Sequence, residues 1–235
     1  MSFCIEKGDE LAVFIQSEHE EFTWDDADLF YRTLDGVLTY ANERLRLVER
    51  DKVTLCSESR EELDDEGRVS DRLWLDRVLV GEYVERNPYE VPEEQLDVAA
   101  PWRYALRDVF IIVRAAEDHI LAMNRDALFC VERLEAPADR HVRAVPSLAL
   151  LTLLPFKGAI VTDSKFIHLE DEMDPSLIGD IRESAHEFAH SGVVSGADAL
   201  VRYSRELPDA NRVPESWQRQ LDEVLGLPHV PGITA

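Results

Sequence analysis

The spacing of apolar and polar residues divides the chain into three zones. In the first zone, Thr23 and Asp26 match a capping box, and the residues that follow place apolar side chains at intervals of three and four. Such spacing is typical of a helix with one buried face. The pattern predicts one long amphipathic helix whose apolar positions are Phe30, Leu34, Val37, Leu38, Ala41, Leu45 and Val48.

A polar, acid-rich stretch over residues 51–67 follows, and we expect it to be a linker or a solvated helical edge. Ser70 is predicted to cap a second helix. This helix should end near Asn87, because a residue that precedes a proline disfavours helical backbone. A short helical turn is expected over residues 92–98.

The middle zone changes period, since short segments rich in β-branched and apolar residues alternate with polar turns. Phe156-Lys157-Gly158 is predicted to be a hairpin turn between two of these segments. The pattern predicts antiparallel strands over residues 108–114, 119–124, 127–133, 148–154, 159–162 and 165–169. One buried cluster on this sheet is expected to contain Leu153, Ile160, Ile111 and Val113.

The closing zone is helical again. A helix is expected from about Gly179, with a capping box formed by Asp180 and Glu183 and a C-cap at Gly192. Two more helices should cover residues 197–206 and 214–225. The order of elements predicts an α+β fold in three regions: a mainly helical region 1–100, an antiparallel β-sheet region 101–172, and a C-terminal helical region 173–235 that packs on the sheet.

The closing zone also holds the string His186-Glu187-Phe188-Ala189-His190, which matches the H-E-x-x-H signature of zinc peptidases. Residues four apart lie on one face of a helix, so His186 and His190 could bind one zinc ion. Glu187 would then be the general base that activates a metal-bound water. This is the only catalytic and metal-binding assignment that the sequence offers.

The surroundings of the string argue against it. Catalytic zinc sites need a third protein ligand, but Gly196 stands where a metzincin has its third histidine. Neither Glu206 nor Glu215, at longer spacing, belongs to a recognisable ligand motif. An apolar stripe formed by Ile178, Ile181, Ala185 and Phe188 would place both histidines on the polar side of the helix. We therefore expect a chance match, with no zinc or other cofactor bound.

The segment Leu153–Asp163 reads LLPFKGAIVTD and is the most distinctive part of the chain. Together with stretches such as Glu82–Tyr89 and Val109–Arg114, it resembles a family of uncharacterised prokaryotic proteins, some of them related to TPR- or SEC-C-containing proteins. The family block commonly ends in Tyr-Asp-Gly, whereas this chain has Thr162 and Ser164 in place of the tyrosine and the glycine. The resemblance spans about Gly81 to Leu200 and implies no established activity.

Composition limits the classes of partner. The chain has 48 acidic and 25 basic residues and a net charge of -23, which repels nucleic-acid phosphates and anionic lipids. Neither nucleic acid nor membrane is therefore expected as a partner. The first ten residues lack the pattern of a signal peptide, and the three cysteines are far apart without a C-x-x-C pair. A cytoplasmic location is expected.

Other candidate residues have simpler interpretations. Cys130 is predicted to be a small buried side chain in a strand rather than a nucleophile. Lys157 and Gly158 at the hairpin tip lack the remainder of a phosphate-binding loop. Asp163, Ser164 and His168 include the residue types of a hydrolase triad, but no strand-turn-helix nucleophile elbow accompanies them.

Two functions from different classes remain. The favoured one is a non-enzymatic interaction or regulatory protein with an unidentified protein partner, and the alternative is a zinc-dependent hydrolase. Four aromatic residues near the predicted junction of the helical and sheet regions either line a groove or fill the core. They are Trp74, Tyr83, Tyr89 and Trp102.

Overall fold

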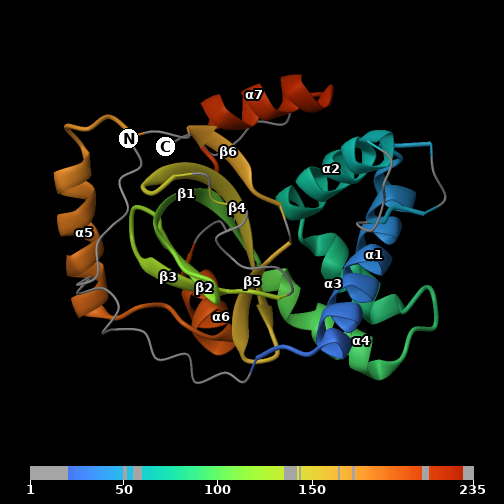
Figure 1. Cartoon of the computed structure of the whole chain (residues 1–235). Coiled ribbons are helices and arrows are strands. Elements are labelled where there is room, and N and C mark those ends of the chain that lie inside the picture. Colours follow the sequence, from blue (N-terminus) through green and yellow to red (C-terminus); the bar gives the residue numbers. More distant parts are fainter. Residues whose placement is uncertain are drawn as a thin grey trace.

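The computed structural model describes residues 21–49, 52–54, 60–134, 142, 144–163, 165–170, 173–207 and 212–229, with only the backbone at 60–63 and 170. Its helices and strands follow one another as drawn in Figure 1: α1 (Trp24–Leu45), α2 (Arg60–Leu75), α3 (Val78–Arg86), α4 (Glu93–Ala99), the 3-10 helix η2 (Ala100–Tyr104), β1 (Leu106–Ala115), β2 (His119–Met123), β3 (Leu128–Glu132), β4 (Ser147–Phe156), β5 (Ala159–Thr162), β6 (Ile167–Glu170), α5 (Ile178–Ser191), α6 (Ala197–Glu206) and α7 (Glu215–Leu225). None of the described helices is long and apolar enough to cross a membrane.

Helix α1 begins with the predicted capping box. The Thr23 hydroxyl accepts a hydrogen bond from the Asp26 backbone N–H at 3.2 Å, and the Asp26 carboxylate accepts one from the Thr23 N–H at 2.8 Å. Two otherwise unpaired backbone donors of the helix terminus are satisfied in this way. The predicted apolar face is buried from Phe30 to Ala41. Its last two predicted positions differ, because Leu45 is exposed at the end of the helix and Val48 lies beyond it.

Helix α2 corrects two predictions. It begins at Arg60, inside the stretch that we expected to be a linker or a solvated edge, and Ser70 lies within it instead of capping it. The Ser70 hydroxyl donates a hydrogen bond to Asp163 at 3.2 Å. The pattern was misleading because several buried side chains of α2 are charged. The single helix that was predicted to run from Ser70 to Asn87 is instead divided, because α2 ends at Leu75 and α3 begins at Val78. Helix α3 ends at Arg86, before Asn87, as predicted.

The six strands form one antiparallel sheet, in which five follow the order β3-β2-β1-β4-β5. Strand β6 pairs with the first half of β4, and β5 pairs with its second half along the same edge. The sheet is curled, because β3 and β5 contact each other although they lie at opposite ends of this order (Figure 1). The predicted α+β class, with helices before and after a central antiparallel sheet, is confirmed.

The core is divided between the two faces of the curled sheet. Leu153 and Ile160 belong to the cluster inside the curl, with Phe110. Ile111 and Val113 belong to a separate cluster under α5. The expectation of one shared cluster was therefore wrong, because successive residues of a strand point to opposite faces of a sheet.

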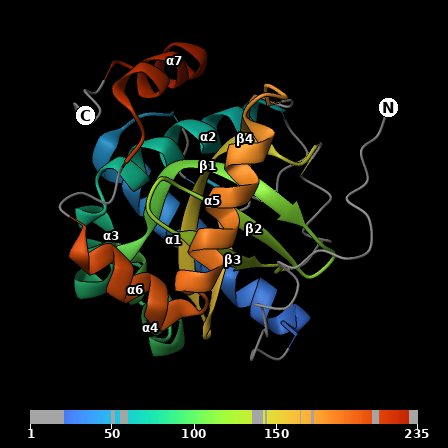
Figure 2. The same ribbon diagram turned by 90° about the vertical axis from the view of Figure 1, so that its left-hand side faces the viewer.

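Each outer layer of helices covers a different part of the sheet (Figures 1 and 2). Helices α1 to α4 pack around Leu154 and Phe156, α5 covers the outer side of β1 to β3, and α7 lies over Val109 and Leu150. The capping box predicted at the start of α5 does not form, since no side chain caps this helix. Its C-cap is Gly192, as predicted.

Candidate functional site

Helix α5 places the H-E-x-x-H string on the outside of the molecule. Ile181, Ala185 and Ala189 bury the inner face of the helix against Leu121 and Cys130 of the sheet. The predicted apolar stripe is thus present, with Phe188 partly buried beside it.

The candidate ligands lie on the other side of α5. His186 is half-buried, while Glu187 and His190 are exposed. Glu215, one of the two carboxylates considered as a third ligand, accepts a hydrogen bond from Arg219 at 2.7 Å on α7. Within the described parts of the chain, three His, Cys, Asp or Glu side chains do not come together in an arrangement that could hold a metal ion.

The hairpin block Leu153–Asp163 joins the helical layer to the sheet. At its tip, the Lys157 ammonium group pairs with Asp26 of α1 at 2.5 Å, and the hydrogen bond from Lys157 lowers the pKa of Asp26 to about 2. The Gly158 carbonyl accepts a hydrogen bond from Ala197 at the start of α6, at 2.8 Å. A Cβ atom on Gly196 would lie 2.9 Å from that carbonyl oxygen, so the contact requires glycine.

The end of the hairpin block is equally engaged. The Asp163 carboxylate is fully enclosed and accepts hydrogen bonds from Trp74 Nε1 at 2.7 Å and from Ser70 Oγ at 3.2 Å, both on α2. Burial raises the pKa of Asp163. Ser164 of the candidate triad lies outside the described residues. These contacts indicate an architectural role for the block. Its tip holds α1 and α6 in place, and its last residue, Asp163, holds α2.

Two further candidates are enclosed in the core. Cys130 lies buried in β3, as predicted, and burial raises the pKa of its thiol to about 12, which disfavours a reactive thiolate. Of the four junction aromatics, Trp74, Tyr83 and Trp102 are fully buried, so they fill the core and do not line a groove.

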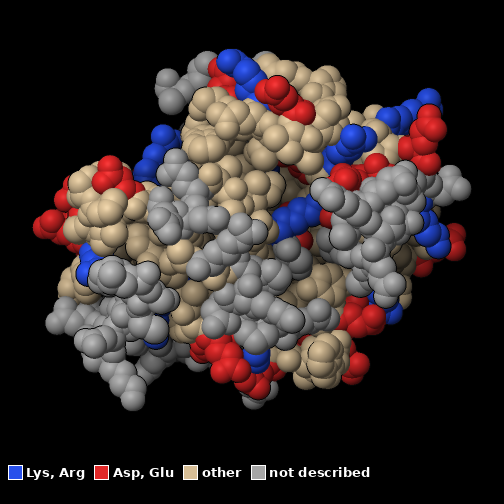
Figure 3. Space-filling model, turned by 45° about the horizontal axis from the view of Figure 1, so that its top comes forward, with Lys and Arg blue, Asp and Glu red and all other residues tan. Residues whose placement is uncertain are grey.

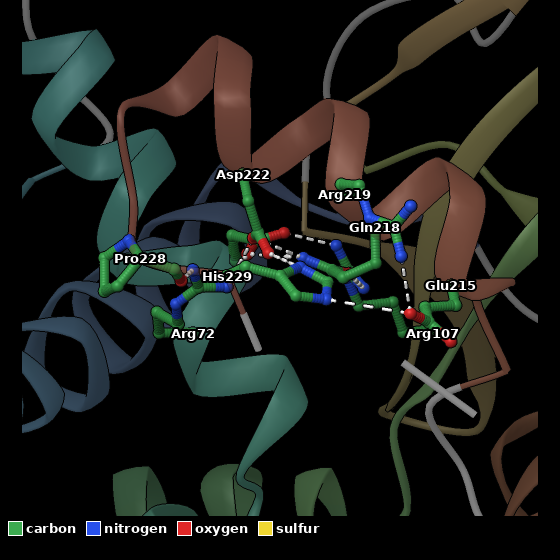
Figure 4. Close-up of polar contacts among 9 residues, drawn as sticks. Arg72, Arg107, Glu215, Gln218, Arg219, Asp222, Pro228 and His229 are labelled. Carbon is green, nitrogen blue, oxygen red and sulfur yellow. Dashed lines mark hydrogen bonds and ion pairs between the residues drawn. The ribbon is translucent and has the colours of Figure 1, made fainter. Parts of the chain in front are cut away.

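A cluster of buried charged residues was not predicted from the sequence. It lies where α2, β1 and α7 meet (Figure 4), and its members are Asp71 and Arg72 of α2, Arg107 of β1, and Gln218 and Asp222 of α7. We call it the α7 anchor. Periodicity could not reveal it, because α2, β1 and α7 supply its members from distant parts of the sequence: Asp71 and Arg107 are 36 positions apart, and Arg107 and Gln218 are 111 positions apart. Taken singly, each member is a residue type that is usually found at the surface.

Every charge in the α7 anchor meets an opposite charge or an amide. Arg107 pairs with Asp71 and donates to Gln218 Oε1 at 2.8 Å. Arg72 bridges Asp71 at 2.9 Å and Asp222 at 2.8 Å. Burial lowers the pKa of Arg107, while the Asp71 carboxylate acts in the opposite direction. Buried ionic groups destabilise a fold unless each of them is paired and hydrogen-bonded in this way.

The anchor continues to the end of the described chain. Arg72 donates to the Pro228 carbonyl at 2.6 Å, and His229 Nδ1 lies 2.9 Å from the Asp222 carboxylate (Figure 4). Apolar contacts support it, since Val213 and Leu221 pack on Leu150. The charges of this cluster therefore hold α7 to α2 and the sheet.

A second polar cluster fixes the segment before α7. Arg212 Nη2 pairs with Asp126 at 2.5 Å, and Arg212 Nη1 donates to Tyr203 Oη at 3.2 Å. Asn124 donates to the buried Asp108 carboxylate at 3.0 Å. Burial raises the pKa of Asp108 to about 6. This carboxyl group therefore titrates in the range where a general acid or base would act, but its neighbours enclose it.

Stability is expected to depend on the charge of Asp108. Its pKa rises from 3.8 to about 6 on folding, so the native state favours the protonated carboxyl. The protonated Asp108 carboxyl contributes its full stabilisation of the folded state below pH 3.8, the pKa of this group in the unfolded chain. This contribution is lost as the pH rises through about 6, which lowers the free energy of unfolding by up to ~3 kcal/mol. Burial shifts the pKa values of Glu66 and Asp163 in the same direction.

The measurement is the free energy of unfolding of the wild type and of Asp108→Asn at several pH values from about 4 to about 8. The difference between the two proteins should change by up to ~3 kcal/mol over this range, in favour of the variant at high pH. Parallel curves for the two proteins would contradict the assignment. Asp28→Asn, at an exposed position of α1, is the control.

Charged side chains of both signs lie on the face shown in Figure 3. They form several small groups, in which acidic and basic side chains are often neighbours, with uncharged side chains between the groups. A protein with a net charge of -23 can therefore still present local basic sites. Comparisons of the chain with protein-family models, with curated proteins and with solved structures gave no match.

Proposed function

We propose that this chain is a non-enzymatic interaction protein that binds a protein partner through the surface around Trp24. The observation that carries the proposal is the exposure of Trp24, whose residue surface is 79 % accessible at the first position of α1. Tryptophan is usually buried in a monomeric protein, and it is enriched among the residues that dominate the energy of protein interfaces. The buried charges of the α7 anchor favour a non-enzymatic role, because they pair with one another inside the protein.

The chemistry around Trp24 favours a basic partner segment. Glu21, Asp25 and Asp28 lie within four residues of it and are exposed. An arginine of a partner could stack on the indole ring and pair with one of these carboxylates. The net charge of -23 would accelerate the encounter with such a partner and would make the binding sensitive to salt.

The test begins with a photo-crosslinking amino acid at position 25, an exposed position next to Trp24 that leaves the indole ring in place, to identify a partner in the native lysate. The purified partner is then titrated against the wild type, Trp24→Ser and Val224→Ser. Val224 is 83 % exposed on α7 and serves as the matched control. Loss of Trp24 should weaken binding about thirtyfold, as expected for an interface hot spot. Equal affinities for all three proteins would reject the proposal.

The alternative of a zinc-dependent hydrolase rests on His186, Glu187 and His190 of α5. We predict that the protein purified without a histidine tag contains less than stoichiometric zinc. We also predict that His186→Ala combined with His190→Ala changes the free energy of unfolding by about 0.5 kcal/mol or less, because these side chains lie on the outer side of the helix.

Elemental analysis and thermal melts with and without a chelator provide the measurements. A native-state metal adds stability that chelation removes. One zinc ion per chain together with a chelator-sensitive melt would favour the hydrolase over the interaction protein.

A further inference from the structure

Two arginines converge on the ring of Tyr104, the last residue of η2. The guanidinium carbon of Arg205 lies 4.6 Å from the ring centroid, and that of Arg103 lies 5.3 Å from it. Helix α6 supplies Arg205 because it packs against η2, on the side of the molecule where α3 and α4 also lie (Figure 2). Both distances fall in the range of a cation–π interaction.

The convergence is unusual because it brings two like charges to one ring. Both arginines are exposed. The structure records contacts of these two guanidinium groups with the Tyr104 ring, but no ion pair with a described carboxylate. By contrast, Arg72, Arg212 and Arg219 each lie against an acidic side chain. The three side chains of this cluster thus carry two positive charges and no negative one, in a chain with almost twice as many acidic as basic residues.

We propose that Arg103, Tyr104 and Arg205 form a binding site for a compact oxyanion with two negative charges, as presented by phosphate esters and small dicarboxylates. The ring orients the two planar guanidinium groups, which leaves their N–H donors available for bidentate hydrogen bonds. A bound dianion would offset the repulsion between the two cations. A compact ligand is favoured because the net charge of -23 repels extended polyanions.

This site is separate from the surface around Trp24, and its existence does not depend on the proposed partner. Titration calorimetry of the full chain with sodium phosphate and with sodium succinate, at constant ionic strength, tests it. We expect saturable binding at one site. Arg205→Gln should lower the affinity about tenfold or more, because a hydrogen bond to a charged group contributes at least that much.

Arg182→Gln is the matched control, since it removes an exposed guanidinium group from α5 and changes the net charge equally. It should change the affinity less than about twofold, because exposed charges at a distance are screened by salt. Tyr104→Phe should retain binding, and Tyr104→Leu should weaken it without a change of charge. Melting curves of the variants show whether each is folded.

The two probes distinguish the sources of the ligand. Saturation by phosphate alone supports a phosphate-ester site, and saturation by succinate as well supports a general site for small dianions. The proposal is overturned if neither anion gives a saturable signal with the folded wild type. It is also overturned if Arg182→Gln weakens binding as much as Arg205→Gln does.

Discussion

The variant Ile112→Asp is expected to lose its folded structure. Ile112 is fully buried inside the curled sheet, in the same cluster as Phe110 and Leu151. The substitution removes a packed aliphatic side chain and places a carboxyl group where it has no polar partner. The combined cost is about 5 kcal/mol or more, which is comparable to the whole stability of a typical domain.

Circular dichroism and thermal unfolding measure this effect. Val224→Asp introduces the same carboxylate at an exposed position of α7 and should change the stability by about 0.5 kcal/mol or less. A cooperative melt of Ile112→Asp near that of the wild type would show that the inner cluster is wrongly assigned. His119 is unsuitable as a mild control, because it is buried in β2 with 9 % of its surface exposed.

The second large effect is expected from Arg107→Met in the α7 anchor. This change keeps most of the side-chain volume but removes one of the two arginines that pair with Asp71, and it leaves Gln218 Oε1 without the donor that Arg107 supplies. Removing one member of a buried ion pair typically costs about 3–5 kcal/mol, because the remaining charge stays desolvated. The free energy of unfolding in urea provides the measurement.

A double-mutant cycle distinguishes a lost ion pair from lost packing. Asp71→Asn combined with Arg107→Met should destabilise the protein less than the sum of the two single changes, with a coupling of about 1–3 kcal/mol. Arg219→Met is the control, since this exposed arginine pairs with Glu215 at the surface. Its loss should cost about 1 kcal/mol or less. Additive effects of Asp71→Asn and Arg107→Met would contradict the anchor.

Local patterns in the sequence were sufficient for most elements of the fold. The capping box at Thr23, the stop at Asn87 and the tip of the hairpin at Gly158 are determined by short-range chemistry, and each was predicted. The sheet was recognisable because alternation and β-branching are also local signals. Such features can be predicted without knowing which residues pack against them.

Several errors arose where a distant residue decides the environment. Helix α2 was placed too late because the residues around Glu66 have the composition of a solvated surface, and the burial of Asp71 and Arg72 was missed for the same reason, although all three are buried. Their partners lie on β1 and α7 and near the end of β5, and periodicity carries no information about them. For the same reason, neither the α7 anchor nor the cluster around Tyr104 could be found before the chain was folded.

The α7 anchor has a consequence for the order in which the protein completes its folding during synthesis. Arg72 and Asp222 are separated by 150 positions, and Gln218 is 147 positions from Asp71. The ribosome therefore produces the charges of α2 long before it produces the residues of α7 that complete their pairing. In a nascent chain, the charged residues of α2 should stay hydrated until α7 emerges. Chains that end before α7 should leave this face of α2 exposed and should be preferred substrates of chaperones and proteases.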